Sequence, residues 1–234
     1  MALLAYTINA LFPAIRSDCV IIGALMILVP GLLITNAMRD IIYGDTNSGI
    51  NRIVQVLLIA VAIALGAATA WSAVATVWAA PVSPVPISHN LLITSLGTAI
   101  GCYGFMFLFN IHGAGGLICV LGGVLTWIVY SVCLKLGCEQ IAAYFWAAAF
   151  ASAFSEVLAR IRKYPATAYL VISLFPLIPG AGVYYTMEYA VQGEMEQFAS
   201  KGMTTAAIAG TIALGILLIS TTVRLWSTRN ARKK

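Results

Sequence analysis

Long apolar runs are the feature that most constrains how this chain can fold. Eight of them can be delimited, at residues 1–15, 19–35, 53–78, 90–110, 115–135, 139–158, 165–187 and 203–225. A helix needs about 20 mostly apolar residues to cross a bilayer. Only 9% of the residues are charged, against roughly 25% in soluble domains. The sequence therefore predicts an all-α polytopic membrane protein with about eight transmembrane helices, because lipid must surround most of its side chains.

Lysine and arginine are distributed unevenly between the loops, and this predicts the orientation. If the tail after residue 226 is cytoplasmic, alternation of the spans puts ten basic residues on that side: Arg39, Arg52, Arg160, Arg162, Lys163, Arg224, Arg229, Arg232, Lys233 and Lys234. Arg16, Lys135 and Lys201 remain outside. Cytoplasmic loops carry the excess of basic residues, so both termini are expected on the cytoplasmic side of the cell inner membrane. The cations form no stripe that would indicate a nucleic-acid partner.

Two short stretches resemble each other at a constant spacing. VPGLLITNAMRDIIYGD covers residues 29–45, and IPGAGVYYTMEYAVQGE covers residues 178–194. At an offset of 149 the matching pairs are Pro30 and Pro179, Gly31 and Gly180, Met38 and Met187, Gly44 and Gly193, and Asp45 and Glu194. Pro-Gly is a common turn pair, but five matches with similar flanking spans favour a true repeat. Each copy is expected to break at Pro-Gly and to continue as an amphipathic segment into a Gly-acid turn.

The expected topology makes these two copies antiparallel, because the second span runs inward and the seventh runs outward. Inverted repeats with matched broken helices are typical of secondary transporters, and the breaks usually frame the substrate site. Spans six to eight pair with spans one to three, whereas spans four and five have no counterpart upstream. A complete pair of five-span units would need two more helices before Met1. This predicts a fragment, or a chain that depends on a partner for those helices.

The same stretches carry a resemblance to a known family. LVPGLLITNAMRDIIYGDTNSGINR, residues 28–52, resembles the end of the N-terminal membrane module of threonine/serine exporters. FSEVLARIRKYPATAYLVISLFPLIPGAGVYYTM, residues 154–187, resembles the smaller C-terminal module, with its Pro-Ala-Thr and Pro-Leu-x-Pro-Gly signatures. The resemblance implies three spans of the first module at 1–80, a Pro-rich loop at 81–89, the five-span second module at 90–226 and a basic tail at 227–234.

The resemblance also implies a function. It predicts a secondary transporter that exports threonine and serine, driven by the proton-motive force. A two-chain relative is associated with succinate and similar dicarboxylates, so a dicarboxylate exporter component is an alternative. The family's first module starts with a cytoplasmic segment and two helices that are missing before Met1, so a non-transporting or partner-dependent subunit is another. The expected partners are the bilayer, the transported acid, a chain supplying the missing helices and a second copy in a homo-oligomer.

Candidate cargo-binding residues surround the two breaks. A break leaves carbonyl groups unpaired and exposes a new helix N-terminus, which suits a carboxylate. Uncharged polar groups just beyond the breaks suit a hydroxy amino acid, although tyrosines at this depth are also ordinary interface anchors. Pro176 joins the set through the family signature. The predicted substrate-binding residues are Pro30, Gly31, Thr35, Asn36, Pro176, Pro179, Gly180, Tyr184 and Tyr185.

Three acidic residues near the spans are candidates for proton coupling, because ionisable groups in membrane segments are costly and usually functional. Asp40 follows the first break, and an interfacial ion pair is its equally weighted alternative. Glu156 precedes Arg160 by four residues, a spacing that favours a helical ion pair over a proton relay. Glu188 lies beyond the second break and is either a coupling group or a solvated side chain.

Several function classes are excluded by missing motifs. The sequence has no G-x-x-x-x-G-K-[ST] motif, so ATP is not expected to drive the chain directly. Its two histidines form no metal-binding constellation, and no pair of groups suggests an intramembrane hydrolase. The sequence therefore predicts a transporter without a cofactor, not an enzyme.

Overall fold

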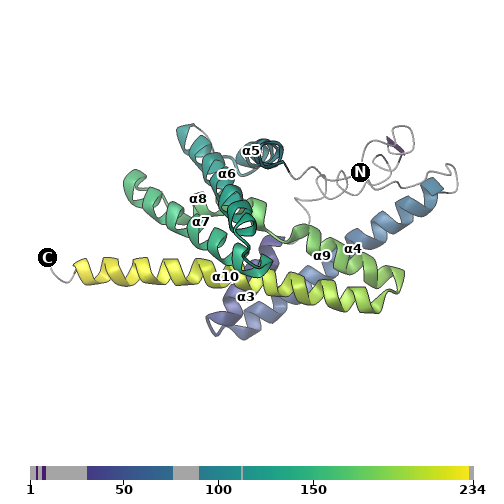
Figure 1. The fold of residues 1–234 in the computed structure, drawn as a ribbon. Helices are drawn as coiled ribbons and strands as arrows, with labels where there is room; N and C mark the ends of the chain where they lie inside the picture. The colour runs from purple at the N-terminus through teal and green to yellow at the C-terminus, as the bar shows by residue number, and fades with distance from the viewer. Residues whose placement is uncertain (1–3, 5–6, 9–30, 76–89, 112, 232–234) are drawn as a thin grey trace. The chain divides into compact units, whose positions relative to one another are not determined.

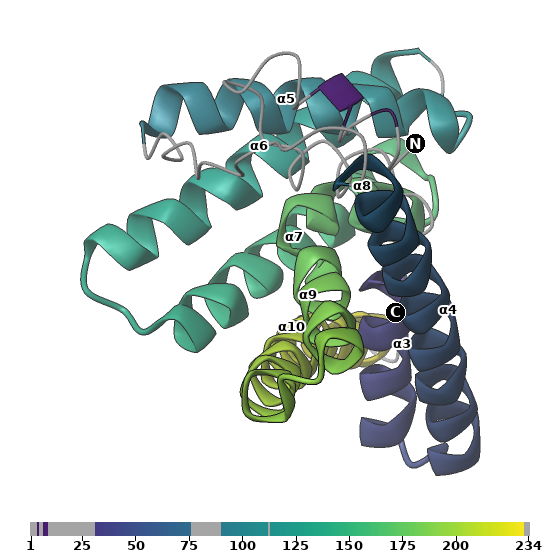
Figure 2. The same ribbon diagram turned by 90° about the vertical axis from the view of Figure 1, so that its right-hand side faces the viewer.

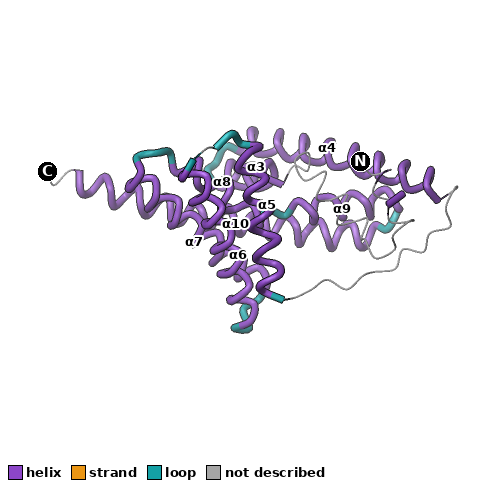
Figure 3. The backbone as a smooth tube through the Cα atoms, turned by 90° about the horizontal axis from the view of Figure 1, so that it is seen from above, coloured by secondary structure: helices purple, strands orange, loops and turns teal. Residues whose placement is uncertain are grey.

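The computed structural model describes residues 4, 7–8, 31–75, 90–111 and 113–231. Its elements in this part of the chain are α3 (Gly31–Ile42), α4 (Thr46–Ala75), α5 (Leu91–Leu108), α6 (Ala114–Lys135), α7 (Gln140–Arg162), α8 (Ala166–Leu174), the 3₁₀ helix η1 (Phe175–Leu177), α9 (Gly180–Gln192) and α10 (Met195–Ala231) (Figure 1). No strand occurs among these residues (Figure 3). The expected all-α class is confirmed.

Within the described residues, five helices are long and apolar enough to cross a membrane: α4, α5, α6, α7 and α10. A sixth crossing results if α8 and η1 are joined with α9 as one interrupted span. The expected segment 1–15, and the part of 19–35 before Gly31, lie outside the described residues apart from residues 4, 7 and 8. The predicted loop at 81–89 also lies outside them.

The chain divides into two compact units that interleave along the sequence. The first unit contains residues 1–87 and 179–207, and the second contains residues 88–178 and 208–234. One crossing from unit to unit therefore falls between Ile178 and Pro179, at the predicted second break. Another falls within α10, whose first part belongs to the first unit and whose remainder belongs to the second.

The described part of the first unit contains two helical hairpins, α3 with α4, and α9 with the start of α10. Their shared core consists of Val56, Ala60, Ala64, Val183 and Met187, with Leu33, Ile34 and Phe198 packed against it. Small residues on α4 let α9 approach closely, as in other membrane helix contacts. Figures 1 and 3 show the α3–α4 turn and the α9–α10 turn at opposite ends of this unit.

The second unit packs α6, α7 and α8 around a core that is rich in alanine. Its buried residues are Tyr130, Ala143, Ala147, Ala148, Ala151, Leu174, Leu177, Ile208, Ile212 and Ile216. Figure 2 shows α6 and α7 as neighbouring helices joined by one turn. The later part of α10 lies close to α7, because a Cβ atom on Gly215 would stand 2.9 Å from the carbonyl oxygen of Phe145.

Two expectations about boundaries need correction. Helix α4 begins seven residues before the expected 53, and α10 runs from Met195 to Ala231 instead of 203–225, since a helix can extend beyond the stretch that hydropathy marks as lipid-facing. Gly115 and Gly116 lie inside α6, within the expected span 115–135. Only Gly113 is in the turn, with φ +70°, whereas Gly116 allows close approach of Met106 from α5.

Candidate functional site

The first predicted break leads into α3. Pro30 lies outside the described residues, while Gly31 is buried and begins the helix. Thr35 is 5% exposed, and its hydroxyl donates to the Gly31 carbonyl at 3.2 Å. Asn36 is half-buried on the next position. The hydroxyl proton of Thr35 is thus engaged within α3, which leaves its oxygen lone pairs to accept from a ligand.

The second predicted break is present as an interruption between η1 and α9. Pro176 lies in η1, and the Ile178 amide closes that turn on the Phe175 carbonyl at 3.3 Å. Pro179 is buried at the N-cap of α9, with φ −78° and ψ 47°. Its carbonyl accepts from Val183, at 3.2 Å, as the first bond of the new helix. Gly180 is buried as the first residue of α9, so the sequence located this break correctly.

The two hairpins agree in detail at the offset of 149. Helices α3 and α9 begin at Gly31 and Gly180, and α4 and α10 begin at Thr46 and Met195. Both first helices are followed by a turn with a glycine of positive φ, +92° at Gly44 and +80° at Gly193. The turn hydrogen bonds also correspond: Gly44 N to Ile41 O with Gly193 N to Ala190 O, Asp45 N to Asp40 O with Glu194 N to Tyr189 O, and Gly49 N to Asp45 O with Phe198 N to Glu194 O. Each turn is a Schellman-type helix end.

The polar residues beyond the breaks occupy equivalent positions in these hairpins. At the same offset, Thr35 corresponds to Tyr184 and Asn36 to Tyr185. Tyr184 is 3% exposed and Tyr185 is half-buried, the same pattern of burial as in α3. The Tyr184 and Tyr185 rings meet edge to face with centroids 5.5 Å apart. The structure thus brings four predicted residues onto two helices that share one core.

Lys201 is a neighbour of this cluster that the sequence did not single out. Its ammonium lies 5.8 Å from the centroid of the Tyr185 ring, within the range of a cation–π contact. The contact joins α9 to the start of α10, inside the first unit. The sequence offered one signal, a lysine just before the apolar run at 203–225.

The candidate proton-coupling residues have different surroundings. Asp40 pairs with Arg52 at 2.9 Å and accepts from the Ser48 hydroxyl at 3.2 Å. Glu156 pairs with Arg160 at 2.7 Å, which confirms the predicted helical ion pair. Glu188 is half-buried on α9, one turn after Tyr184. The ion pairs that the sequence indicated as alternatives for Asp40 and Glu156 are therefore both present.

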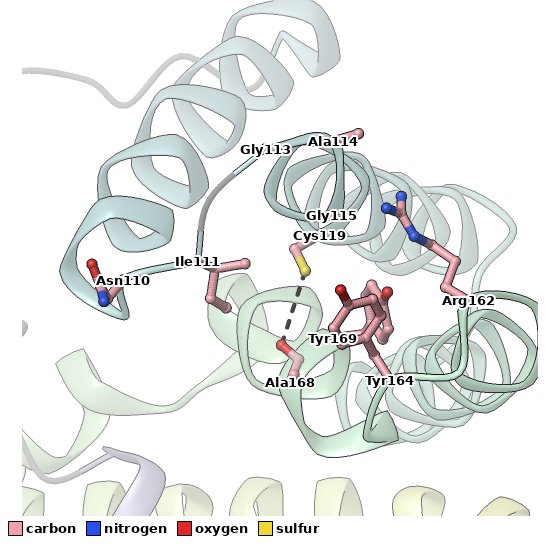
Figure 4. Close-up of a pocket in the computed structure, with 10 residues that line it drawn as sticks. All are labelled: Asn110, Ile111, Gly113, Ala114, Gly115, Cys119, Arg162, Tyr164, Ala168 and Tyr169. Atoms are coloured by element: carbon pink, nitrogen blue, oxygen red, sulfur yellow. Dashed lines mark hydrogen bonds between the residues drawn. The ribbon is translucent and has the colours of Figure 1, made fainter.

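A pocket that the sequence did not predict opens in the second unit. Its volume is about 480 Å³. It lies between the start of α6 and the connection from α7 to α8 (Figure 4). The polar and glycine residues that line it are Asn110, Gly113, Gly115, Arg162, Tyr164 and Tyr169. In the sequence, Arg162 contributes only to the expected orientation. Two segments about 50 residues apart form the pocket, so no local pattern could have revealed it.

No group of three or more His, Cys, Asp or Glu residues in the described part of the chain could hold a metal ion. Cys102, Cys119, Cys133 and Cys138 are free thiols.

Comparison with known sequences identifies the family. Residues 94–222, more than half of the chain, match the family described as "Threonine/Serine exporter, ThrE". Residues 1–74 match a second family, described as "Putative threonine/serine exporter". The search of curated proteins finds no match, nor does the search of solved structures. With its several candidate spans, the chain is a multi-pass membrane protein and belongs to the threonine/serine exporter family.

Proposed function

We propose that this chain is a secondary transporter that exports small polar organic acids, threonine and serine first among them, in exchange for protons. The observation that carries the proposal is the pair of matched hairpins, each with a helix that starts at a buried glycine. Family membership indicates a transporter rather than an enzyme. Matched, interrupted helices are the form that substrate sites take in secondary transporters.

The cargo is proposed to bind at the starts of α3 and α9. The first amide groups of each helix have no acceptor within the helix and carry partial positive charge, which suits the carboxylate of an amino acid. Proline at 179 has no amide hydrogen, so the carbonyls before it need other donors, and a cargo ammonium can serve. Tyr184 and Tyr185 would add hydrogen bonds to the cargo hydroxyl, together with Thr35 and Asn36.

An inverted relation between the hairpins is part of the proposal. It is supported by the directions in which α4 and the first part of α10 leave their turns, which are opposite in Figures 1 and 3. Two inverted repeats allow a transporter to adopt two similar conformations, one open to each side of the membrane. Exchange between these states would carry the cargo outward without ATP.

Glu188 is the favoured group for proton coupling. It lies on the helix that follows the second break, one turn beyond Tyr184 and half-buried. A carboxyl group there can change charge while the cargo is bound nearby. Asp40 and Glu156 each pair with an arginine within 3 Å, a contact that favours a structural role for both carboxylates.

The test replaces Gly31 or Gly180 by leucine. A side chain at either position blocks the close backbone approach on which the site depends, so export should stop. Gly97→Leu is the matched control, because a Cβ atom there meets nothing within 4 Å on an exposed face of α5. The measurement is intracellular accumulation of threonine and of succinate in cells expressing membrane-verified variants, with any partner chain supplied.

If both leucine variants export at the rate of the parent chain, the cargo does not bind at the breaks. If a leucine variant fails to insert, Tyr184→Phe and Tyr185→Phe test the same site with the ring volume kept, and each should export threonine more slowly. Accumulation of succinate but not threonine would assign the chain to dicarboxylate export. If the parental chain lowers intracellular acid only when a partner chain is present, it is a partner-dependent subunit.

A further inference from the structure

The pocket at the start of α6 has a pronounced electrostatic character. Arg162 is the charged residue that lines it, and none of its lining residues is acidic. Figure 4 shows the guanidinium of Arg162 directed toward the first turn of α6. That helix has 22 residues, and its first amide groups add partial positive charge at the same place. Both contributions favour an anion.

Arg162 is available for such an anion. The neighbouring cation Arg160 is already paired with Glu156 at 2.7 Å, whereas Arg162 makes no ion pair with any residue that the structure describes. Arg162 is half-buried, so its charge is only partly screened by solvent. A guanidinium in this position can form two parallel hydrogen bonds to a carboxylate or a phosphate.

Tyr169 provides an independent indication of a ligand. It is 3% exposed as a residue and lines the pocket, and its hydroxyl makes no hydrogen bond to a described residue. A molecule held in the pocket can accept a hydrogen bond from it. Figure 4 shows the hydroxyl oxygens of Tyr164 and Tyr169 both directed toward the α6 side of the pocket.

The floor of the pocket leaves room for a small molecule. Gly113 turns the chain with φ +70°, and Gly115 has nothing within 4 Å of the place where a Cβ atom would stand. The volume of about 480 Å³ falls at the lower end of the range for small-molecule sites. A molecule with a single carboxylate and a few further heavy atoms fits this volume and this charge.

We propose that this pocket receives the carboxylate of the exported acid before it reaches the breaks, an inference that rests on the proposed function. The Arg162 guanidinium and the first amides of α6 bind the carboxylate, and the Tyr169 hydroxyl donates to it. The two connections that line the pocket are both cytoplasmic in the expected topology. The pocket therefore lies on the side from which an exporter loads.

The test measures equilibrium binding of radiolabelled threonine and succinate to the purified full-length chain in detergent. Arg162→Gln should weaken binding at least tenfold, since a hydrogen-bonded charge is lost. Lys163→Gln is the matched control, because it removes the same charge one position later, at a residue that does not line the pocket. Gly115→Leu fills the pocket without changing charge and should weaken binding as strongly. Tyr169→Phe should weaken it several-fold.

Binding that is equally tight in Arg162→Gln and the parent would overturn the proposal. So would the absence of saturable acid binding together with saturable binding of labelled phosphatidylglycerol that Arg162→Gln weakens, which would identify a lipid headgroup as the occupant. The binding assay does not depend on transport. If the pocket variants lose binding while neither they nor the parent chain export the acid, the pocket assignment holds and the proposed export function is wrong. If export proceeds in Arg162→Gln with parental binding, only the pocket assignment fails.

Discussion

The carboxylates of Asp40 and Glu156 each pair with an arginine. The Glu156–Arg160 pair follows from spacing alone, because residues four apart share a helix face. Asp40 pairs with Arg52 instead, across the turn between α3 and α4, and no local spacing indicates such a partner. Arg162 and Tyr169 could not be recognised at all, since their significance depends on the start of α6. Residue-scale prediction therefore succeeded within a helix and failed between helices.

Proton coupling can be tested at three residues together. Glu188→Gln should remove the dependence of export on external pH, because the variant cannot exchange a proton. Asp40→Asn should retain that dependence and lower the free energy of unfolding by at most about 1 kcal/mol, the usual value of a partly exposed ion pair. Arg52→Gln breaks the same pair without removing a carboxyl group, so it should behave like Asp40→Asn. The measurements are export rates across a pH series and thermal unfolding in detergent.

A flat pH profile in Asp40→Asn, with a parental profile in Arg52→Gln, would contradict this assignment. It would identify Asp40 as the coupling group, since only its own titration would then explain the difference between the two variants.

At the scale of elements, breaks and turns were more predictable than lengths and contacts. Proline and glycine act locally, so the interruption before Gly180 and the turns at Gly44 and Gly193 could be read from the sequence. Helix lengths were predicted too short, because hydropathy marks only the part of a helix that lies in the bilayer. Helix α10 continues in both directions beyond its apolar centre. Glycines that permit close packing, such as Gly116, resemble turn glycines in sequence and differ only in their neighbours.

The two turn glycines provide a test of equivalence between the hairpins. Gly44 and Gly193 have φ of +92° and +80°, with nothing within 4 Å of an added Cβ atom. Alanine at either position should therefore cost only backbone strain, about 1–2 kcal/mol. Asparagine should cost less, because it tolerates the left-handed conformation. Thermal unfolding of the four purified variants measures these costs. Unequal losses for the two alanine variants would show that the turns are not energetically equivalent.

At the scale of the whole molecule, the sequence predicts an orientation that depends on charge counts. The excess of basic residues at alternate loops follows the general bias of membrane proteins. Within the second unit, the connections after α5 and after α7 line one pocket, as alternation requires of two loops on the same side. The sequence could not show that the chain folds into two interleaved units, because that division depends on contacts between distant segments.

The last prediction joins the orientation to the inverted relation of the hairpins. Tyr43 and Gln197 are exposed beside the α3–α4 and α9–α10 turns. In a background lacking the five native cysteines, cysteine at 197 should react with an impermeant thiol reagent in intact cells. Cysteine at 43 should react only in inverted membrane vesicles. Cysteine at 163 is the cytoplasmic reference. Labelling of 43 and 197 from the same side would contradict the inversion, since two hairpins related by an axis in the membrane plane must expose their turns to opposite compartments.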